Sequence, residues 1–110
     1  MNLTKMQFLV LAVLLRCPMH PYAIRQEIIE LSGRRAWPSQ SSVRAAIVSL
    51  LARRGLIQEC FYSDPHYWLK AKRGVPYELT KTGRQTVERE LNMYREVISE
   101  ARFWLNKFDA

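Results

Sequence analysis

The side chains best suited to recognise another molecule lie between residues 39 and 49. Arg44 has the planar guanidinium needed to donate two hydrogen bonds to guanine O6 and N7, and Gln40 could pair with adenine in a similar two-pronged way. Ser41, Ala45 and Ser49 are small and would let a helix backbone approach another surface closely, and Ser39 at the start of the helix belongs to the same candidate interface. This composition is typical of a helix that contacts base edges in DNA, although an ordinary solvent-exposed helix face also has it.

Cations form a second group in the segment that precedes the last predicted strand. Lys70, Lys72 and Arg73 lie next to a glycine and among aromatic residues, which indicates a basic loop at the tip of a hairpin. Such a loop can contact phosphates beside the groove. Tyr22 and Arg25, in an earlier helix, are expected to add further phosphate contacts. A solvated loop without any partner is the alternative interpretation.

The overall charge agrees with a polyanionic partner. The chain has 110 residues, and its 17 Lys and Arg against 10 Asp and Glu give a formal net charge of +7 at pH 7. A surface of this kind favours nucleic acid or an anionic membrane. No apolar run approaches the roughly 18 residues that a transmembrane helix needs, and the longest one, residues 8–15, has no basic leader. With only two cysteines we expect a cytoplasmic protein with reduced thiols.

Metal binding and catalysis are the competing kinds of chemistry. Cys17, His20, Cys60 and His66 could supply four zinc ligands in number, but Cys17 directly follows an apolar helix, so we do not expect a metal site. The sequence contains no glycine-rich phosphate loop, nucleophile elbow or zinc-protease motif. Its acidic residues are spread over helix faces. We therefore expect neither an enzyme nor a cofactor.

Local signals divide the chain into four helices and two strands. Thr4 and Gln7 have the spacing of a capping box, Pro21 suits a first helical turn, and Ser39 suits an N-cap. Gly33 and Gly55 are expected to follow helix ends. The predicted helices cover residues 4–16, 21–32, 39–54 and 80–108, and the predicted strands cover residues 56–62 and 75–79. The core-facing residues expected in the second helix are Ile24, Ile28 and Leu31. Those expected in the third helix are Val43, Ile47, Leu50 and Leu51.

The last predicted helix has a heptad pattern along its whole length. The residues that alternate spacings of four and three are Val87, Leu91, Tyr94, Ile98, Ala101, Leu105 and Phe108. A helix of this length measures about 40 Å, whereas a body of the preceding 80 residues is only about 25 Å across. Part of the apolar stripe must therefore be covered by something else, and we expect a second copy of the chain to cover it.

The order of elements predicts the fold class: mainly α with a small β-wing, a winged helix-turn-helix followed by a long C-terminal dimerisation helix. Residues 1–80 would form the DNA-binding part and residues 81–110 the dimerisation helix, in one structural unit. In winged helices the third helix enters the major groove of double-stranded DNA. The sequence therefore predicts a homodimeric DNA-binding transcription regulator. A winged-helix adaptor that binds other proteins instead of an operator is the alternative.

Motifs along nearly the whole chain resemble those of the PadR family of transcription regulators. They are Leu3-Thr4 with Phe8-Leu9-Val10-Leu11, Pro18-Met19-His20 with Tyr22 and Ile24, Pro38-Ser39, Gly55-Leu56-Ile57, and Tyr77-Glu78-Leu79-Thr80-Lys81-Thr82-Gly83-Arg84. The short length and single C-terminal helix are similar to the compact subgroup. The resemblance implies a homodimer, a palindromic operator, and repression that a small hydrophobic or phenolic ligand relieves.

Three positions depart from the family pattern. Pro21 stands where the family usually has glycine, Arg44-Ala45 stands where it has Tyr-Pro, and Val75-Pro76 replaces basic residues before the last strand. Arg44 would thus occupy a DNA-facing position with different chemistry. We expect DNA binding to be retained and the operator sequence to differ.

Aromatic side chains on the first and last helices suggest where an effector could bind. Phe8, Tyr94, Trp104 and Phe108 could line a cavity between these helices. Compact PadR-like regulators are similar in holding planar aromatic compounds between tryptophans of the dimer-forming helix. Aromatic residues at heptad spacing are also typical of a plain dimer core, and this alternative stays open.

Overall fold

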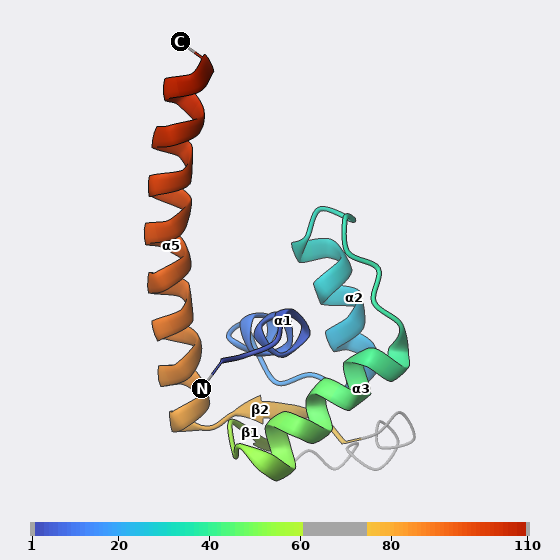
Figure 1. Ribbon diagram of the computed structural model, residues 1–110. Helices are drawn as coiled ribbons and strands as arrows, with labels where there is room; N and C mark the ends of the chain where they lie inside the picture. The colour runs from blue at the N-terminus through green and yellow to red at the C-terminus, as the bar shows by residue number, and fades with distance from the viewer. Residues whose placement is uncertain (1, 61–74, 110) are drawn as a thin grey trace.

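The structure is a computed structural model that describes residues 2–60 and 75–109 (Figure 1). Its elements are α1 (Lys5–Leu14), α2 (Pro21–Leu31), α3 (Gln40–Val48), the π-helical turn η1 (Ser49–Arg53), β1 (Ile57–Glu59), β2 (Tyr77–Leu79) and α5 (Lys81–Asp109). This order confirms the predicted fold class: a mainly helical body, a two-stranded antiparallel hairpin and a long C-terminal helix.

Helix α1 is the centre of the body. The Thr4 hydroxyl accepts a hydrogen bond from the Gln7 backbone N–H at 3.1 Å, and the Gln7 side chain accepts one from the Thr4 N–H at 3.0 Å, which confirms the capping box. Val10 and Leu11 are fully buried because α1 packs against α2, α3 and α5. Figure 1 shows α1 end-on between α5 on one side and α2 and α3 on the other.

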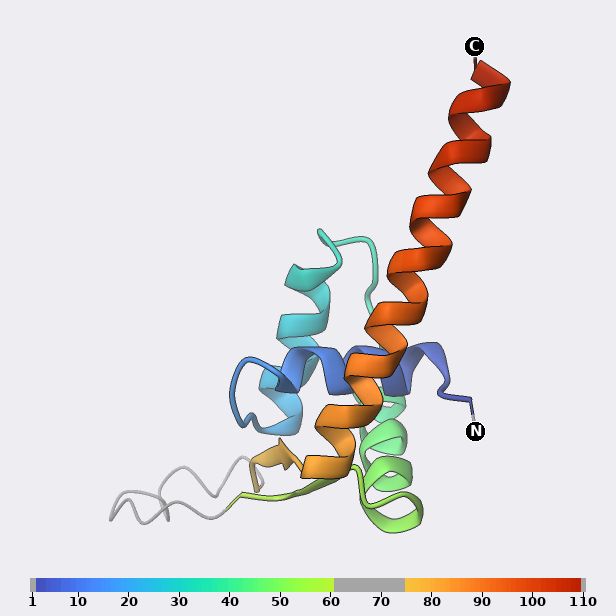
Figure 2. The same ribbon diagram turned by 90° about the vertical axis from the view of Figure 1, so that its left-hand side faces the viewer.

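Helix α2 begins with Pro21 at its first position, as predicted. Ile24 and Ile28 are fully buried, but Leu31 is 61% exposed and does not belong to the buried stripe as expected. The last turn of α2 extends beyond α1 in both views, so Leu31 lies past the helix that would cover it (Figures 1 and 2). Gly33 has a φ of +65° after the helix end, which glycine adopts without steric cost.

Helix α3 is capped by Ser39 and buries Val43 and Ile47, as predicted. Its C-terminal continuation, η1, widens to π-helical geometry and buries Leu50. Leu51 is only partly buried, because it lies at the margin of the core rather than inside it. The helical segment ends before Gly55, whose φ is +61°.

The hairpin pairs Ile57 with Leu79 and Glu59 with Tyr77 in antiparallel register. Both strands have three residues, so they are shorter than the predicted 56–62 and 75–79. Tyr77 also exchanges two backbone hydrogen bonds with Met19, of 2.8 and 3.0 Å, on its other edge. Met19 precedes α2, so this bridge anchors the entrance of the helix-turn-helix to the hairpin. Lys70, Lys72 and Arg73 lie outside the described residues.

Helix α5 starts in the body and then leaves it. Thr80 caps it: its hydroxyl accepts from the Gly83 N–H at 3.0 Å and donates to the Gly55 carbonyl at 2.9 Å. Val87 is fully buried in the core formed with α1 to α3. The rest of α5 projects away from the body (Figure 2). The molecule accordingly measures 60 × 27 × 22 Å, and its radius of gyration of 16.1 Å exceeds the roughly 13 Å of a compact chain of this length.

Candidate nucleic-acid interface

One face of α3 is open to solvent and carries the side chains expected to contact DNA. Ser41, Arg44, Ala45 and Val48 are exposed and follow the helical spacing of one face, whereas Val43, Ala46 and Ile47 are buried on the other. Figure 1 places α3 across the body from α5, with α1 between them. The face is therefore open within one protomer, and its charged side chain is a cation.

Ser39 organises the start of this helix. Its hydroxyl accepts from the Ser42 backbone N–H at 3.1 Å, donates to the Ser42 hydroxyl at 2.9 Å, and lies 3.2 Å from the hydroxyl of Ser41. These contacts satisfy one of the helix's first N–H groups, which is the ordinary task of an N-cap. The hydroxyl is therefore already used within the protein, and Ser39 contributes to an interface mainly by setting where the helix begins.

Gln40 and Ser49 are placed differently from the sequence-based expectation. The amide nitrogen of Gln40 is buried, with no hydrogen-bond partner among the described residues, so in this conformation it does not face a groove. The Ser49 hydroxyl accepts a hydrogen bond of 2.9 Å from the Gln7 side chain of α1. Ser49 thus ties the end of α3 to α1, a contact between positions 42 residues apart that no local pattern indicates.

The turn before α3 is held by Arg25, which was expected to contact a phosphate. Its Nε donates to the Pro38 carbonyl at 2.8 Å, so this nitrogen fixes the approach to the Ser39 cap. Trp37 in the same turn donates from its indole nitrogen to the Arg34 carbonyl at 2.7 Å. Tyr22, in the first turn of α2, is 57% exposed and accessible to a partner.

Tyr77 at the base of the hairpin has charged neighbours of both signs. Burial raises the pKa of its phenol above the ordinary value of 10.0, the Glu59 carboxylate raises this pKa further, and the Arg44 guanidinium opposes the shift. Glu59 is the direct cross-strand partner of Tyr77. The exposed face of α3 and the root of the hairpin are therefore close enough to share an electrostatic environment, which the sequence did not reveal.

The projecting part of α5 carries an apolar stripe that the described residues of the protomer leave largely uncovered. The exposed fractions are 41% for Leu91, 53% for Ile98, 61% for Leu105 and 85% for Phe108. Val87 differs from the other heptad residues because it is buried in its own protomer, so the uncovered stripe begins at Leu91. A stripe of this size is unusual on a protein surface and marks an interaction site.

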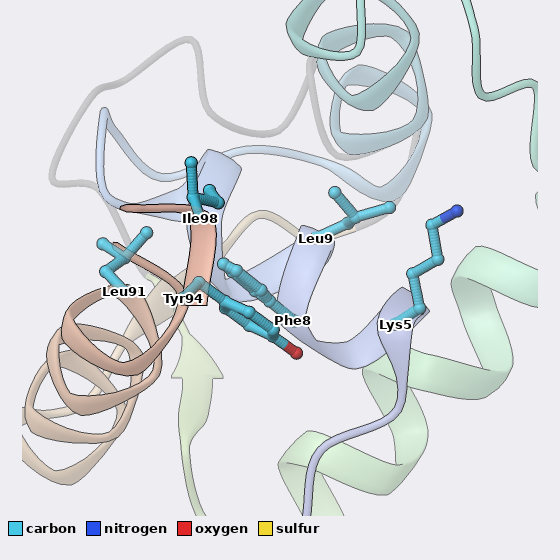
Figure 3. A pocket seen from close by; sticks show the side chains of 6 residues that line it. All are labelled: Lys5, Phe8, Leu9, Leu91, Tyr94 and Ile98. Atoms are coloured by element: carbon cyan, nitrogen blue, oxygen red, sulfur yellow. The ribbon is translucent and has the colours of Figure 1, made fainter. Parts of the chain in front are cut away.

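A pocket of about 550 Å³ lies where α5 leaves α1 (Figure 3). It is lined by Lys5, Phe8, Leu9, Leu91, Tyr94 and Ile98. The Phe8 and Tyr94 rings are stacked, with centroids 4.9 Å apart and planes 9° from parallel. Of the four aromatic residues expected in a ligand cavity, the structure brings these two together. The spacing of Lys5, Phe8 and Leu9 on one helix face could have indicated the rest of the α1 side.

Trp104 and Phe108 lie elsewhere on α5. Trp104 is about 15 Å further along the helix than Tyr94 at 1.5 Å per residue, so it does not line the same pocket within a protomer. Its indole nitrogen donates to the Glu100 carboxylate at 3.1 Å, and the Lys107 ammonium lies 5.1 Å from its ring centroid. Trp104 is nevertheless 48% exposed and remains accessible.

The metal-binding alternative finds no supporting cluster in residues 2–60 and 75–109, where no three side chains of the metal-ligating types gather. Cys17 is exposed and Cys60 is buried, and His66 lies outside the described residues. Within the same described ranges, no helix is both long and apolar enough to cross a membrane.

Comparisons with known proteins identify the fold. No family model matches the sequence, and the search of curated proteins finds no match. Among solved structures, the transcriptional regulator BldR from Sulfolobus solfataricus is similar over 92% of this chain, with a TM-score of 0.70 and 25% identity. The adhesin competence repressor AdcR from Streptococcus pyogenes is similar over 96%, with a TM-score of 0.69 and 18% identity. This chain spans 62% and 66% of those two proteins, less than two thirds of each.

A transcriptional regulator from Clostridium thermocellum is closer in length. The likeness covers 90% of this chain and 97% of that one, with a TM-score of 0.65 and 16% identity. At these identities the likeness concerns the backbone arrangement. The chain therefore has the winged helix-turn-helix fold with a long C-terminal helix, as these transcriptional regulators do.

Proposed function

We propose that this protein is a sequence-specific DNA-binding transcription regulator that acts as a homodimer. The observation that carries the proposal is the face of α3 that exposes Ser41, Arg44 and Ala45, while Val43, Ala46 and Ile47 on the other face are buried in the winged-helix core. The net charge of +7 and the likeness to three solved transcriptional regulators support it.

In this proposal α3 enters the major groove, which is wide enough for an α-helix. Arg44 donates to guanine, and Ser41 approaches the backbone or a base edge. Tyr22 binds a phosphate, joined by Lys70, Lys72 and Arg73, which belong to the part of the hairpin outside the described residues. Arg25 acts indirectly, by holding Pro38 and hence the start of α3.

Two copies pair through the uncovered stripe of α5 from Leu91 to Phe108. The stripe is too long for one body to cover, and a two-fold axis through it would present two α3 helices to successive turns of a duplex. The operator is then a palindrome. Pairing would also remove from water large apolar side chains that one protomer leaves exposed on α5, among them Ile98, Leu105 and Phe108.

The resemblance to the PadR family leads us to propose further that the protein represses transcription and that a small aromatic or hydrophobic ligand releases it. The pocket between α1 and α5 is the proposed site, because its lining is apolar apart from Lys5 and the Tyr94 hydroxyl. Leu91, Tyr94 and Ile98 line this pocket and also belong to the stripe proposed to pair two copies. A ligand here would act on the dimer interface and thereby on the spacing of the two α3 helices.

The test is operator binding as a function of salt. Each phosphate contact should contribute a slope of about −0.9 to the logarithm of affinity against the logarithm of salt concentration. Arg44→Ala should weaken binding to a selected duplex by about 1–3 kcal/mol and relax one base preference. Arg89→Ala, an exposed cation on α5 away from the apolar stripe, is the matched control. An affinity for duplex DNA that hardly responds to salt would refute the proposal and favour the protein-binding adaptor.

A further inference from the structure

The exposed face of α3 contains an apolar hollow between two arginines. It has a volume of about 370 Å³ and is lined by Arg44, Ala45, Val48, Ser49 and Arg53. We call it the α3 hollow. Val48 is 61% exposed, whereas Val43 and Ile47 on the same helix are buried at 0% and 3% exposure. Single exposed aliphatic side chains are common on proteins, so the exposure of Val48 alone does not indicate a binding site.

Two features distinguish this arrangement from an ordinary exposed valine. Ala45 and Val48 are neighbours at a spacing of three, so their methyl groups form one apolar floor. Arg44 lies about 6 Å from Val48 along the axis of α3, and Arg53 follows Val48 in η1, so the two arginines lie on opposite sides of Val48 along the chain. None of the described residues that line the hollow is acidic. An apolar floor between two cationic hydrogen-bond donors complements a partner that is apolar at one point and carries hydrogen-bond acceptors or an anion on either side.

The major groove of DNA has this combination. Among the groups that base pairs present there, the thymine C5-methyl is the apolar one, and the others are hydrogen-bond donors and acceptors. Phosphates border the groove on both sides. Resting on the function proposed above, we infer that the α3 hollow takes the 5-methyl group of a thymine, which Ala45 and Val48 contact while Arg53 reaches a flanking phosphate. The thymine would be selected for its methyl group rather than for its hydrogen-bonding edge.

The experiment uses the full-length protein and a duplex recovered by selection from random-sequence DNA. Each thymine in turn is replaced by deoxyuridine, which removes only the methyl group. One position per half-site should lose about fourfold in affinity, the value expected for one buried methyl, and about fifteenfold when both half-sites are replaced. The unsubstituted thymine duplex, prepared in parallel, gives the reference affinity.

The variant Val48→Ala should bind the thymine and deoxyuridine duplexes with nearly equal affinity. Leu31→Ala, which truncates an aliphatic side chain of the same 61% exposure on α2, should keep the wild-type preference. Equal affinity of the wild-type protein for both duplexes overturns the inference. So does a preference that survives in Val48→Ala, because the methyl group is then read elsewhere. If either of these results is found while binding to duplex DNA still depends on salt, the thymine inference is wrong but the proposed function stands. If the proposed function itself is wrong, no duplex should show salt-dependent binding.

Discussion

Replacing Gly83 by alanine tests how α5 is attached to the body. In the interior of an ordinary helix this change stabilises by about 1 kcal/mol. Here a methyl group on Gly83 would overlap the Leu56 carbonyl oxygen and lie 2.9 Å from its carbonyl carbon. Both obstacles are backbone atoms, so no side chain can rotate away to make room. Helix α5 would have to move, so Gly83→Ala should destabilise the folded protein instead of stabilising it.

The magnitude follows from the contacts that such a movement breaks. The Thr80 N–H donates to the Leu56 carbonyl at 3.0 Å, and the Thr80 hydroxyl donates to the Gly55 carbonyl at 2.9 Å. Each hydrogen bond contributes about 1 kcal/mol, and overpacking a well-packed contact costs about 1–3 kcal/mol. When the gain of about 1 kcal/mol in helix propensity is subtracted from these costs, Gly83→Ala should lower the free energy of unfolding by about 2–4 kcal/mol.

Urea unfolding followed by circular dichroism measures this loss, at one protein concentration for all variants because dimer stability depends on concentration. Gly33→Ala is the matched control: its φ is +65° and nothing lies within 4 Å of the new methyl, so it should cost only the backbone strain of about 1 kcal/mol. Gln85→Ala, on an exposed position of α5, should change little. If Gly83→Ala were as stable as the unaltered protein, α5 would not dock against Leu56 as described.

Two further predictions concern the dimer and the hairpin. Ile98→Lys places a charge in the proposed α5 seam and should weaken dimerisation by about 3 kcal/mol or more, whereas Ser99→Lys, at an exposed position about 100° around the helix from Ile98, should not; sedimentation that finds both variants equally dimeric would remove the pairing model. The pKa of Tyr77 is raised in the folded protein, so the unfolded chain releases the phenol proton first as the pH rises above 10.0. The contribution of the Tyr77 phenol to stability is therefore complete below that pH and is lost as the pH rises through the pKa of the folded state. Tyr77→Phe should therefore lose less stability between about pH 9 and pH 11, and parallel curves for the two proteins would show that the phenol does not contribute.

Features that depend on a few neighbouring residues were predictable from the sequence. The capping box of Thr4 and Gln7, Pro21 at the start of α2 and the Ser39 cap all appear as expected, because each is a hydrogen bond or a dihedral preference within one turn. The heptad pattern of α5 likewise predicted a long amphipathic helix, and its apolar stripe is largely uncovered in the protomer.

Which of the candidate groups face a partner was decided only when the helices packed together. The Ser49 hydroxyl is bound by Gln7, Arg25 Nε is bound by the Pro38 carbonyl, and Val87 lies inside the core. Each of these contacts joins segments that are distant along the chain or on different elements. Helical periodicity specifies a face of one helix, but it does not specify how far a neighbouring helix covers that face. The distances and angles of docking are set by the shapes of all the packed side chains together, and so belong to the tertiary structure.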